Sequence, residues 1–102
     1  MTTAPLIDII IIYQLEVKFM DNIDARWETL EAKCRECKKC SLCETRTNCV
    51  FGTGNRNADL MFVGEAPGEQ EDLSGTPFVG RAGQLLDRFL YAVDIKREDA
   101  YI

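Results

Sequence analysis

The middle of the chain reads Leu60-Met61-Phe62-Val63-Gly64-Glu65-Ala66-Pro67-Gly68. Its first four residues are a continuous apolar run without polar alternation, which is typical of a strand buried on both faces of a parallel sheet. Gly64 ends the run and opens a long loop, residues 65–78, rich in glycine, proline and acidic side chains. Ligands of open α/β sheets bind beyond the carboxyl ends of the strands. The stretch therefore predicts a buried strand followed by a ligand-binding loop.

The residues after this loop predict a helix and then another strand. From about Gly80, apolar side chains recur at helical spacing; they are Leu85, Leu86, Phe89, Leu90 and Val93. A connection over residues 96–99 leads to Tyr101-Ile102, the first step of a second strand. The order strand, loop, helix, strand is the start of an α/β doubly wound sheet. Because a stable sheet needs three or more strands, we expect the chain either to hold only part of a domain or to fold differently from its pattern.

Upstream, a helix is predicted over residues 21–33. The side chains of Ile23, Trp27, Leu30 and Cys34 fall on one helical face. Asp21 or Asn22 can cap its start.

The N-terminal residues 6–13 are almost entirely apolar. This run is shorter than the roughly 20 residues that a membrane span needs, and it lacks the basic start and the cleavage site of a signal peptide. A β-strand and a true translation start at Met20 are both compatible with it. Residues 1–20 are therefore set apart as an N-terminal extension, residues 21–102 are assigned to the domain, and no membrane association is expected.

Five cysteines lie between residues 34 and 49. Four of them follow one another at CxxC spacing, and the set is Cys34, Cys37, Cys40, Cys43 and, further on, Cys49. An odd number in so tight a cluster does not suit a disulfide framework, so metal binding in a reducing, cytoplasmic compartment is expected. Structural zinc sites usually separate two CxxC pairs by a longer spacer. The continuous run therefore favours an iron–sulfur cluster over zinc, with at least one cysteine left over, since a cubane takes four.

Charge is distributed unevenly along the chain. The net charge is −5, yet residues 33–56 carry six Lys or Arg against two Asp or Glu. A local basic stripe is what a phosphate backbone requires, and a solvated loop is the ordinary alternative.

Two further motifs also have a functional and an ordinary interpretation. The loop over residues 64–68 has neither the lysine of a P-loop nor a GxGxxG fingerprint, so it is either a ligand loop or a plain acidic connection. Phe78 precedes the second helix. Its ring could stack on a planar ligand, as rings do in nucleic-acid enzymes, or it could pack beneath the loop.

Taken together, residues 27–102 resemble the family 4 uracil-DNA glycosylases. The residues that carry the resemblance are Cys37-Lys38-Lys39-Cys40-Ser41-Leu42, Arg46, residues 50–55, Ala58-Asp59-Leu60, residues 63–68, Glu71-Asp72, Gly75 and residues 77–86. No single piece is decisive, but the ordered set at these spacings is highly specific. The resemblance implies an α/β/α sandwich around a short parallel sheet, of which this chain would hold the first strand–loop–helix unit.

The family's cofactor is a [4Fe–4S] cluster, held by an N-terminal CxxC and by two cysteines much later in the chain. Counted back from Arg46 and Gly52, the matching pair is Cys37 and Cys40. The resemblance then leaves as extras Cys34, Cys43 and Cys49. It places the other two ligands beyond residue 102.

The implied activity is base-excision DNA repair, in which the N-glycosidic bond of uracil in DNA is hydrolysed. Uracil-containing DNA is the expected partner, and no obligate protein partner is inferred. Such enzymes flip the base into a pocket and stabilise the departing anion electrostatically while a water attacks. By resemblance, the pocket loop that positions this water consists of Gly64, Glu65, Ala66, Pro67 and Gly68. Ala66 stands where better-known uracil glycosylases carry an aspartate, so Glu65 is given a pocket role and not that of a general base.

Two more pocket residues follow from the resemblance. Phe78 is similar to the ring that stacks on uracil, and Glu71 to the residue that crowds the 5-methyl position of thymine. The family pattern continues with an asparagine that reads the uracil edge and a histidine near the leaving base. This chain contains no histidine and ends before that asparagine, so we predict no excision by the 102 residues alone.

Two other hypotheses remain at this point. One is a small cysteine-rich Fe–S or Zn module that serves as an interaction or DNA-docking unit. The other is a ferredoxin-like electron-transfer protein, which would not need the acidic glycine-rich loop or the Pro77-Phe78 step.

Overall fold

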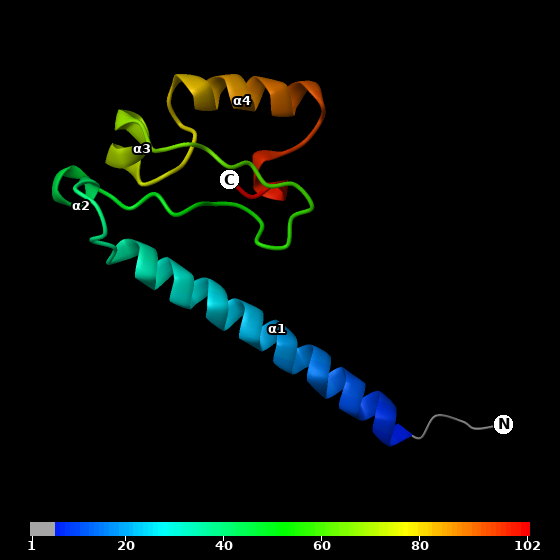
Figure 1. Cartoon of the computed structure of the whole chain (residues 1–102). Helices are drawn as coiled ribbons and strands as arrows, with labels where there is room; N and C mark the ends of the chain where they lie inside the picture. Colours follow the sequence, from blue (N-terminus) through cyan, green and yellow to red (C-terminus); the bar gives the residue numbers. More distant parts are fainter. Residues whose placement is uncertain (1–5) are drawn as a thin grey trace. The chain divides into compact units, whose positions relative to one another are not determined.

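The computed structural model describes residues 6–102, and for residues 6, 7 and 16–21 it describes the backbone alone. The chain divides into two compact units, Met1–Glu36 and Cys37–Ile102. The described elements are α1 (Leu6–Arg35), α2 (Leu42–Thr45), α3 (Glu69–Ser74), α4 (Arg81–Ala92) and the short 3-10 helix η1 (Arg97–Asp99) (Figure 1). The predicted extension over residues 1–20 stays a prediction, and its first five residues lie outside the described part.

The first unit is built on α1, a single helix of 30 residues. The predicted start at Asp21 or Asn22 is wrong, because both positions lie inside this helix. The alternative of a β-strand over residues 6–13 is wrong for the same reason. Residues 6–35 contain neither glycine nor proline, and β-branched isoleucines lower helix propensity only slightly. Nothing in the local sequence therefore interrupts the helix between its two ends.

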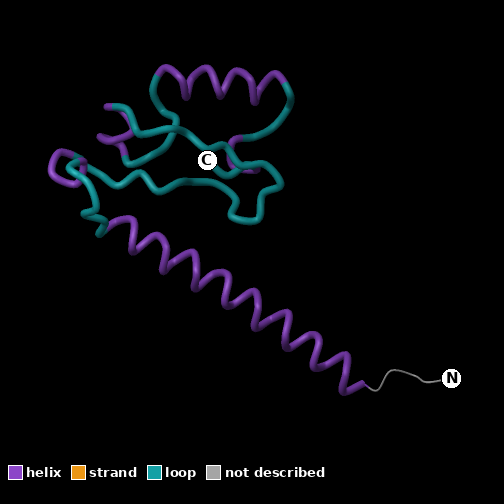
Figure 2. Tube along the Cα trace, in the orientation of Figure 1, coloured by secondary structure: helices purple, strands orange, loops and turns teal. Residues whose placement is uncertain are grey.

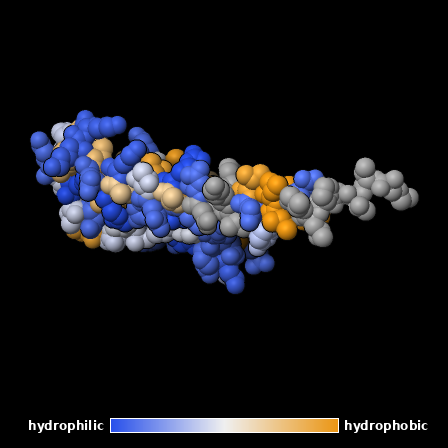
Figure 3. All heavy atoms as spheres, turned by 90° about the horizontal axis from the view of Figure 1, so that it is seen from below, coloured by the Kyte–Doolittle hydropathy of each residue, from blue (hydrophilic) through white to orange (hydrophobic). Residues whose placement is uncertain are grey.

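The N-terminal half of α1 carries an exposed apolar patch. Each residue of the patch is between 47% and 67% exposed. The patch consists of Ile9, Ile10, Ile11, Ile12, Tyr13 and Leu15. Figure 3 shows this patch as a group of hydrophobic atoms. None of the described helices has both the length and the apolar content that a membrane crossing requires.

In the second unit, the chain segment predicted as a long loop contains α3. Gly68 precedes this helix, and Gly75 ends it in the left-handed conformation, with φ 74°. The Glu71 carboxylate accepts a hydrogen bond from the Gly68 N–H, at 3.1 Å, as the third helical residue does in a capping box. This local capping explains why a helix of one and a half turns forms in so glycine-rich a stretch.

The two predicted strands are present only as pairing segments. Tyr101 forms a parallel bridge with Met61 and an antiparallel bridge with Gly54. The Tyr101 N–H donates to the Leu60 carbonyl at 3.0 Å, and the Phe62 N–H donates to the Tyr101 carbonyl at 2.8 Å. Among the described residues no segment pairs far enough to count as a strand, as Figure 2 shows. The parallel direction of the bridge between Met61 and Tyr101 agrees with the predicted parallel sheet, whereas among the described residues neither segment forms a strand.

The core of the second unit lies around residues 100–102. The buried apolar residues are Leu90, Ala100, Tyr101 and Ile102, each no more than 8% exposed. The Thr53 and Ile102 backbones exchange two hydrogen bonds of 2.9 Å, so residues 100–102 are paired on both sides.

Burial of the first predicted strand on both faces is not observed. Met61 is 55% exposed and Val63 is 84% exposed. Phe62 is half-buried, and among the described residues no layer covers the exposed side chains of Met61 and Val63.

Helix α4 begins where the sequence predicts. Gly80 is its N-cap, and the helix ends at Ala92. Leu90 is its buried apolar residue and Leu86 is half-buried, while Leu85, Phe89 and Val93 are exposed. The predicted apolar stripe is therefore only partly covered by the described residues.

Candidate functional site

The loop that follows Val63 borders a cavity of about 270 Å³, which we call the loop cavity. Four stretches of the second unit and the helix α3 supply its lining. The lining residues are Val50, Phe51, Met61, Phe62, Val63, Gly64, Ala66, Pro67, Glu71, Pro77, Phe78, Tyr101 and Ile102.

Most of the pocket residues expected from the sequence meet at this cavity. Gly64, Ala66, Pro67, Glu71 and Phe78 all line it. The two remaining ones, Glu65 and Gly68, are not part of the lining. Glu65 is exposed to solvent.

The Phe78 ring is packed closely against the loop. A side chain on Gly64 would bring its first carbon to 2.8 Å from the ring carbon Cε2, so only glycine allows this contact. The backbone of Phe78 has φ 51°, in the left-handed region that few aromatic residues adopt. A side chain on Gly83 would collide with the Phe78 carbonyl. The ring therefore sits on a tight turn between two glycines.

Glu71 joins the two sides of the loop cavity. Its Oε1 accepts hydrogen bonds from the N–H groups of Val79, at 2.9 Å, and Gly80, at 2.8 Å. Its Oε2 accepts the N–H of Gly68 at 3.1 Å. The N–H of Gly80, together with the other backbone donors, holds the pKa of the Glu71 carboxyl below its ordinary value, although desolvation acts in the opposite direction.

The neighbouring carboxylate, Asp72, holds a different segment. Its Oδ1 accepts the N–H groups of Thr47, at 2.8 Å, and Asn48, at 3.1 Å. In return, the Asn48 side-chain amide donates to the carbonyls of Asp72 and Leu73. The backbone N–H of Asn48 is the main cause that lowers the pKa of the Asp72 carboxyl. Asp72 therefore ties the end of the cysteine-rich segment to α3.

A second cavity, of about 560 Å³, contains most of the cysteines, and we call it the cysteine cavity. Its lining residues are Cys37, Cys40, Leu42, Cys43, Thr45, Arg46, Asn48, Cys49, Val50, Pro67, Gly68, Glu69 and Asp72. Cys34, by contrast, lies on α1 in the first unit. The structure thus brings together four of the five cysteines, and it brings in Cys49, which the CxxC spacing alone did not include.

The cysteine cavity is the place where thiol side chains gather in the second unit. All five cysteines are free thiols. No three His, Cys, Asp or Glu side chains among residues 6–102 are placed to hold one metal ion. Cys37 and Cys40 line this cavity together with Cys43 and Cys49.

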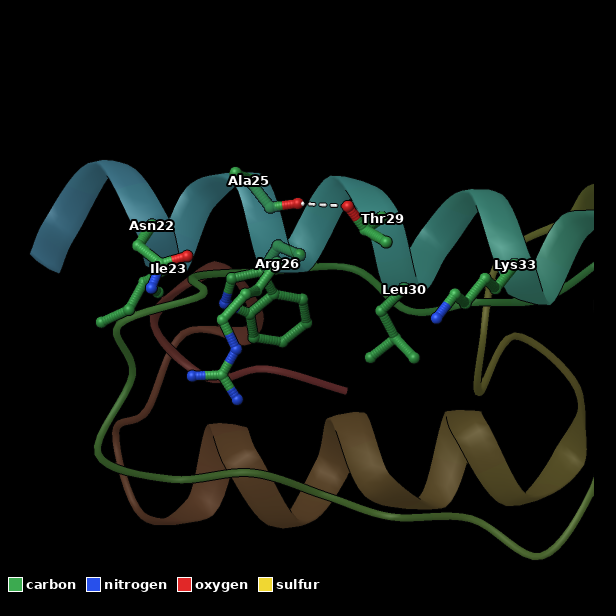
Figure 4. Close-up of a pocket in the computed structure, with 8 residues that line it drawn as sticks. Asn22, Ile23, Ala25, Arg26, Thr29, Leu30 and Lys33 are labelled. Atoms are coloured by element: carbon green, nitrogen blue, oxygen red, sulfur yellow. Dashed lines mark hydrogen bonds between the residues drawn. The ribbon is translucent and has the colours of Figure 1, made fainter.

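A third hollow lies along α1 and has a different character. It is lined by Asn22, Ile23, Ala25, Arg26, Trp27, Thr29, Leu30 and Lys33 (Figure 4). These residues include basic and apolar side chains but no thiol or carboxylate. The one hydrogen bond drawn there runs within the helix, from the Thr29 hydroxyl to the Ala25 carbonyl at 2.8 Å. This hollow therefore lacks the groups on which the expected chemistry depends.

Several lining residues of the loop cavity were not expected from the sequence. Val50 and Phe51 precede the Gly52 turn, and Tyr101 and Ile102 come from the second pairing segment. Phe51 is the one with a readable signal, because an aromatic side chain directly before a turn glycine faces either a core or a ligand.

Comparison with known proteins adds to this geometry. The model of the uracil DNA glycosylase superfamily matches residues 51–102, which include every residue of the loop cavity except Val50. The chain belongs to the uracil DNA glycosylase superfamily.

The similar proteins of this superfamily are type-4 uracil-DNA glycosylases. The chain is 53% identical over 78 residues to that of Archaeoglobus fulgidus, a match that covers 74% of this chain and 39% of the relative. It is 48% identical over 84 residues to that of Saccharolobus solfataricus, covering 81% and 37%. It is 50% identical over 80 residues to that of Thermotoga maritima, covering 76% and 42%.

The resemblance to family 4 inferred from the sequence is thereby confirmed. The chain spans about two-fifths of the length of the curated uracil-DNA glycosylases that it matches.

Proposed function

We propose that this chain forms the uracil-pocket side of a type-4 uracil-DNA glycosylase, which in its whole form hydrolyses the N-glycosidic bond of uracil in DNA. The observation that carries the proposal is the packing of the Phe78 ring against Gly64 at the loop cavity. An aromatic face beside a backbone-lined recess is what a flipped, planar base requires. The partner is then DNA that contains uracil, and the role is base-excision repair.

The chemistry assigned to the loop is placement and not proton transfer. A flipped uracil would stack on Phe78, and the backbone of residues 64–68 would line its edge and help to position a water. Ala66 offers no carboxylate, so the departing uracil anion must be stabilised electrostatically. Glu65 contributes to the surroundings of the pocket. Glu71 lines the cavity, where its bulk would crowd the 5-methyl group of thymine.

The proposed fold is the start of an α/β/α sandwich with a short parallel sheet. The parallel bridge between Met61 and Tyr101 supports this assignment, as does the helix α4 that connects the two paired segments. Residues 21–102 would belong to this domain, preceded by an extension over residues 1–20.

The proposed cofactor is a [4Fe–4S] cluster. Cys37 and Cys40 would supply two of its thiolates, and the other two are expected beyond residue 102. When bound, the cluster cross-links the segments that carry its thiolate ligands. In this chain, the joint position of Cys37 and Cys40 in the cysteine cavity supports the assignment.

Two measurements on the 102-residue chain test the pocket. Uracil added at millimolar concentration should shift the NMR signals of Phe78 and Gly64, whereas thymine, which differs by one methyl group, should not. A uracil-containing single-stranded oligonucleotide should release no uracil above a mock-purified control, because the 102 residues contain no histidine to act near the leaving base.

Each outcome has a defined meaning. If neither base shifts the signals of the loop cavity, the pocket assignment is wrong and a cysteine-rich docking module becomes the better reading. If uracil is released above the control, the 102 residues are active by themselves and the expectation of inactivity is wrong.

A further inference from the structure

The carboxylate of Glu71 caps the start of its own helix, α3, and also reaches a turn eight to nine residues further along the chain. Its Oε2 accepts the N–H of Gly68, at the end of the loop that lines the cavity. Its Oε1 accepts the N–H groups of Val79 and Gly80, directly after Phe78. One side chain on α3 thus bridges the pocket loop and the turn that carries the ring.

The Phe78 turn needs such an anchor because its backbone is unfavourable. A non-glycine residue at φ 51° occupies the left-handed region, and it stays there only when the surroundings hold it. On the N-terminal side of the ring, the Arg97 guanidinium donates to the Pro77 carbonyl, and it also pairs with Asp87 at 2.7 Å. On the C-terminal side, Glu71 accepts both of the next two N–H groups. The ring is therefore held from both ends.

The Glu71 anchor bears on the position of the Phe78 ring. The Phe78 ring approaches Gly64 so closely that a first side-chain carbon there would lie 2.8 Å from Cε2. Released from Val79 and Gly80, the turn would relax towards a common backbone conformation. The ring would then move away from Gly64 and out of register with the cavity.

We propose that Glu71 is a positioning residue that holds the Phe78 ring against Gly64 by clamping the backbone on both sides of the loop cavity. The inference rests on the proposed function only in taking this cavity as the uracil site. The clamp requires an ionised carboxylate that is long enough to reach both segments. A role in excluding thymine by bulk would require only the size of the side chain.

Two substitutions separate these requirements. Glu71→Gln keeps the size but only one acceptor oxygen, so it can accept from one of the two segments while its NH2 group faces the N–H donor of the other. Glu71→Asp keeps the charge but shortens the reach by one methylene. Glu44→Gln removes an exposed carboxylate that lines neither cavity and is the control.

The first readout is structural and needs no ligand. In the 102-residue chain, the nuclear Overhauser contact between the Phe78 ring and the Gly64 Hα protons should be present in the wild type and in Glu44→Gln. It should be lost in Glu71→Gln and in Glu71→Asp, together with the amide protection of Val79 and Gly80. Retention of the ring contact in both Glu71 variants, with the chain folded by its other contacts, would overturn the clamp.

The second readout is ligand binding, measured by uracil titration. Both Glu71 variants should bind uracil about tenfold more weakly, in line with the loss of hydrogen bonds to a charged group. Thymine should remain excluded in Glu71→Gln, because the bulk is kept. If the ring contact disappears but uracil never bound the wild type, the clamp stands and the pocket assignment fails. If uracil binds all variants equally while the ring contact is lost, the positioning role is wrong.

Discussion

Glu71 and Asp72 are neighbours in the sequence, yet their carboxylates hold different parts of the chain. Glu71 accepts backbone donors at the loop cavity, while Asp72 accepts those of Thr47 and Asn48 beside the cysteine cavity. Consecutive residues on a helix point about 100° apart, so a short helix can serve two sites at once. Both carboxylates of this acidic stretch therefore serve as acceptors for backbone N–H groups.

The ring of Phe78 offers the sharpest test at this scale. Phe78→Ala removes the proposed stacking surface, which is worth roughly 1–3 kcal/mol per base, so uracil binding should fall by about tenfold or more. Phe89→Ala, which removes a ring that is 61% exposed on α4, should leave binding unchanged. Uracil titration of both variants measures the difference.

Thermal unfolding of the same variants distinguishes a pocket ring from a core ring. A truncated core phenylalanine costs about 3–5 kcal/mol, and the half-buried Phe78 should cost well below that. A loss of stability in the core range would assign Phe78 to packing under the loop instead of to the base.

At the scale of elements, α4 and the two apolar segments around residues 60–63 and 101–102 could be predicted from sequence because their signals are local. Helix α4 has an N-terminal glycine and apolar side chains at helical spacing. Helix α3 was missed because its formation depends on Glu71 reaching back to Gly68, a contact that no periodicity reveals. The early start of α1 was missed because its isoleucine run is uniform and so carries no helical period.

The site could be predicted in part for the same reason. Motif resemblance identified Gly64, Ala66, Pro67, Glu71 and Phe78, and the structure brings these five residues to one cavity. The contribution of Tyr101 could not be anticipated, since it depends on long-range pairing. The backbone partners of Glu71 could not be predicted either, because nothing in a sequence shows which backbone N–H groups a carboxylate will accept.

The cysteine segment leads to a prediction about individual elements. Cys34 lies on α1, whereas Cys37 lines the cysteine cavity. In an extended protein that carries the later cysteines of the family, Cys37→Ala should lose bound iron and Cys34→Ala should retain it. Iron analysis and the cluster's visible absorbance report the result. Loss of iron from both variants would instead support a site built from the adjacent CxxC repeats.

For the whole molecule, the small number of buried side chains sets the scale of stability. The described core consists of Leu90, Ala100, Tyr101 and Ile102, and small domains bury a limited share of their surface. Because the core is small, the hydrogen bonds of the Glu71 and Asp72 carboxylates should contribute a measurable part of the free energy of unfolding of the second unit.

This contribution predicts that the free energy of unfolding depends on pH. The pKa values of Glu71 and Asp72 lie below their ordinary values of 4.5 and 3.8 in the folded chain. The unfolded chain therefore binds more protons in acid, and the stabilisation is complete above the ordinary values and lost as pH falls through the lowered ones. The free energy of unfolding in urea should fall from pH 6 to about pH 3.

The matched comparison uses two double variants. Glu71→Gln with Asp72→Asn should flatten this pH profile, while Glu44→Gln with Glu98→Gln, two exposed positions elsewhere, should leave its shape unchanged. Identical profiles for wild type and for the Glu71 and Asp72 variant would contradict the assignment of acid sensitivity to these two groups.

Val50 and Pro67 line both the loop cavity and the cysteine cavity. Because these two residues form a partition between the two cavities, a ligand bound in one cavity acts on the wall of the other. If metal loading shifts this partition and thereby changes the affinity for a base by some factor, base binding must change the affinity for metal by the same factor. The NMR signal of a fluorine label at residue 67 should therefore shift when either cavity is occupied. An unchanged signal on addition of either ligand would show that the partition is rigid.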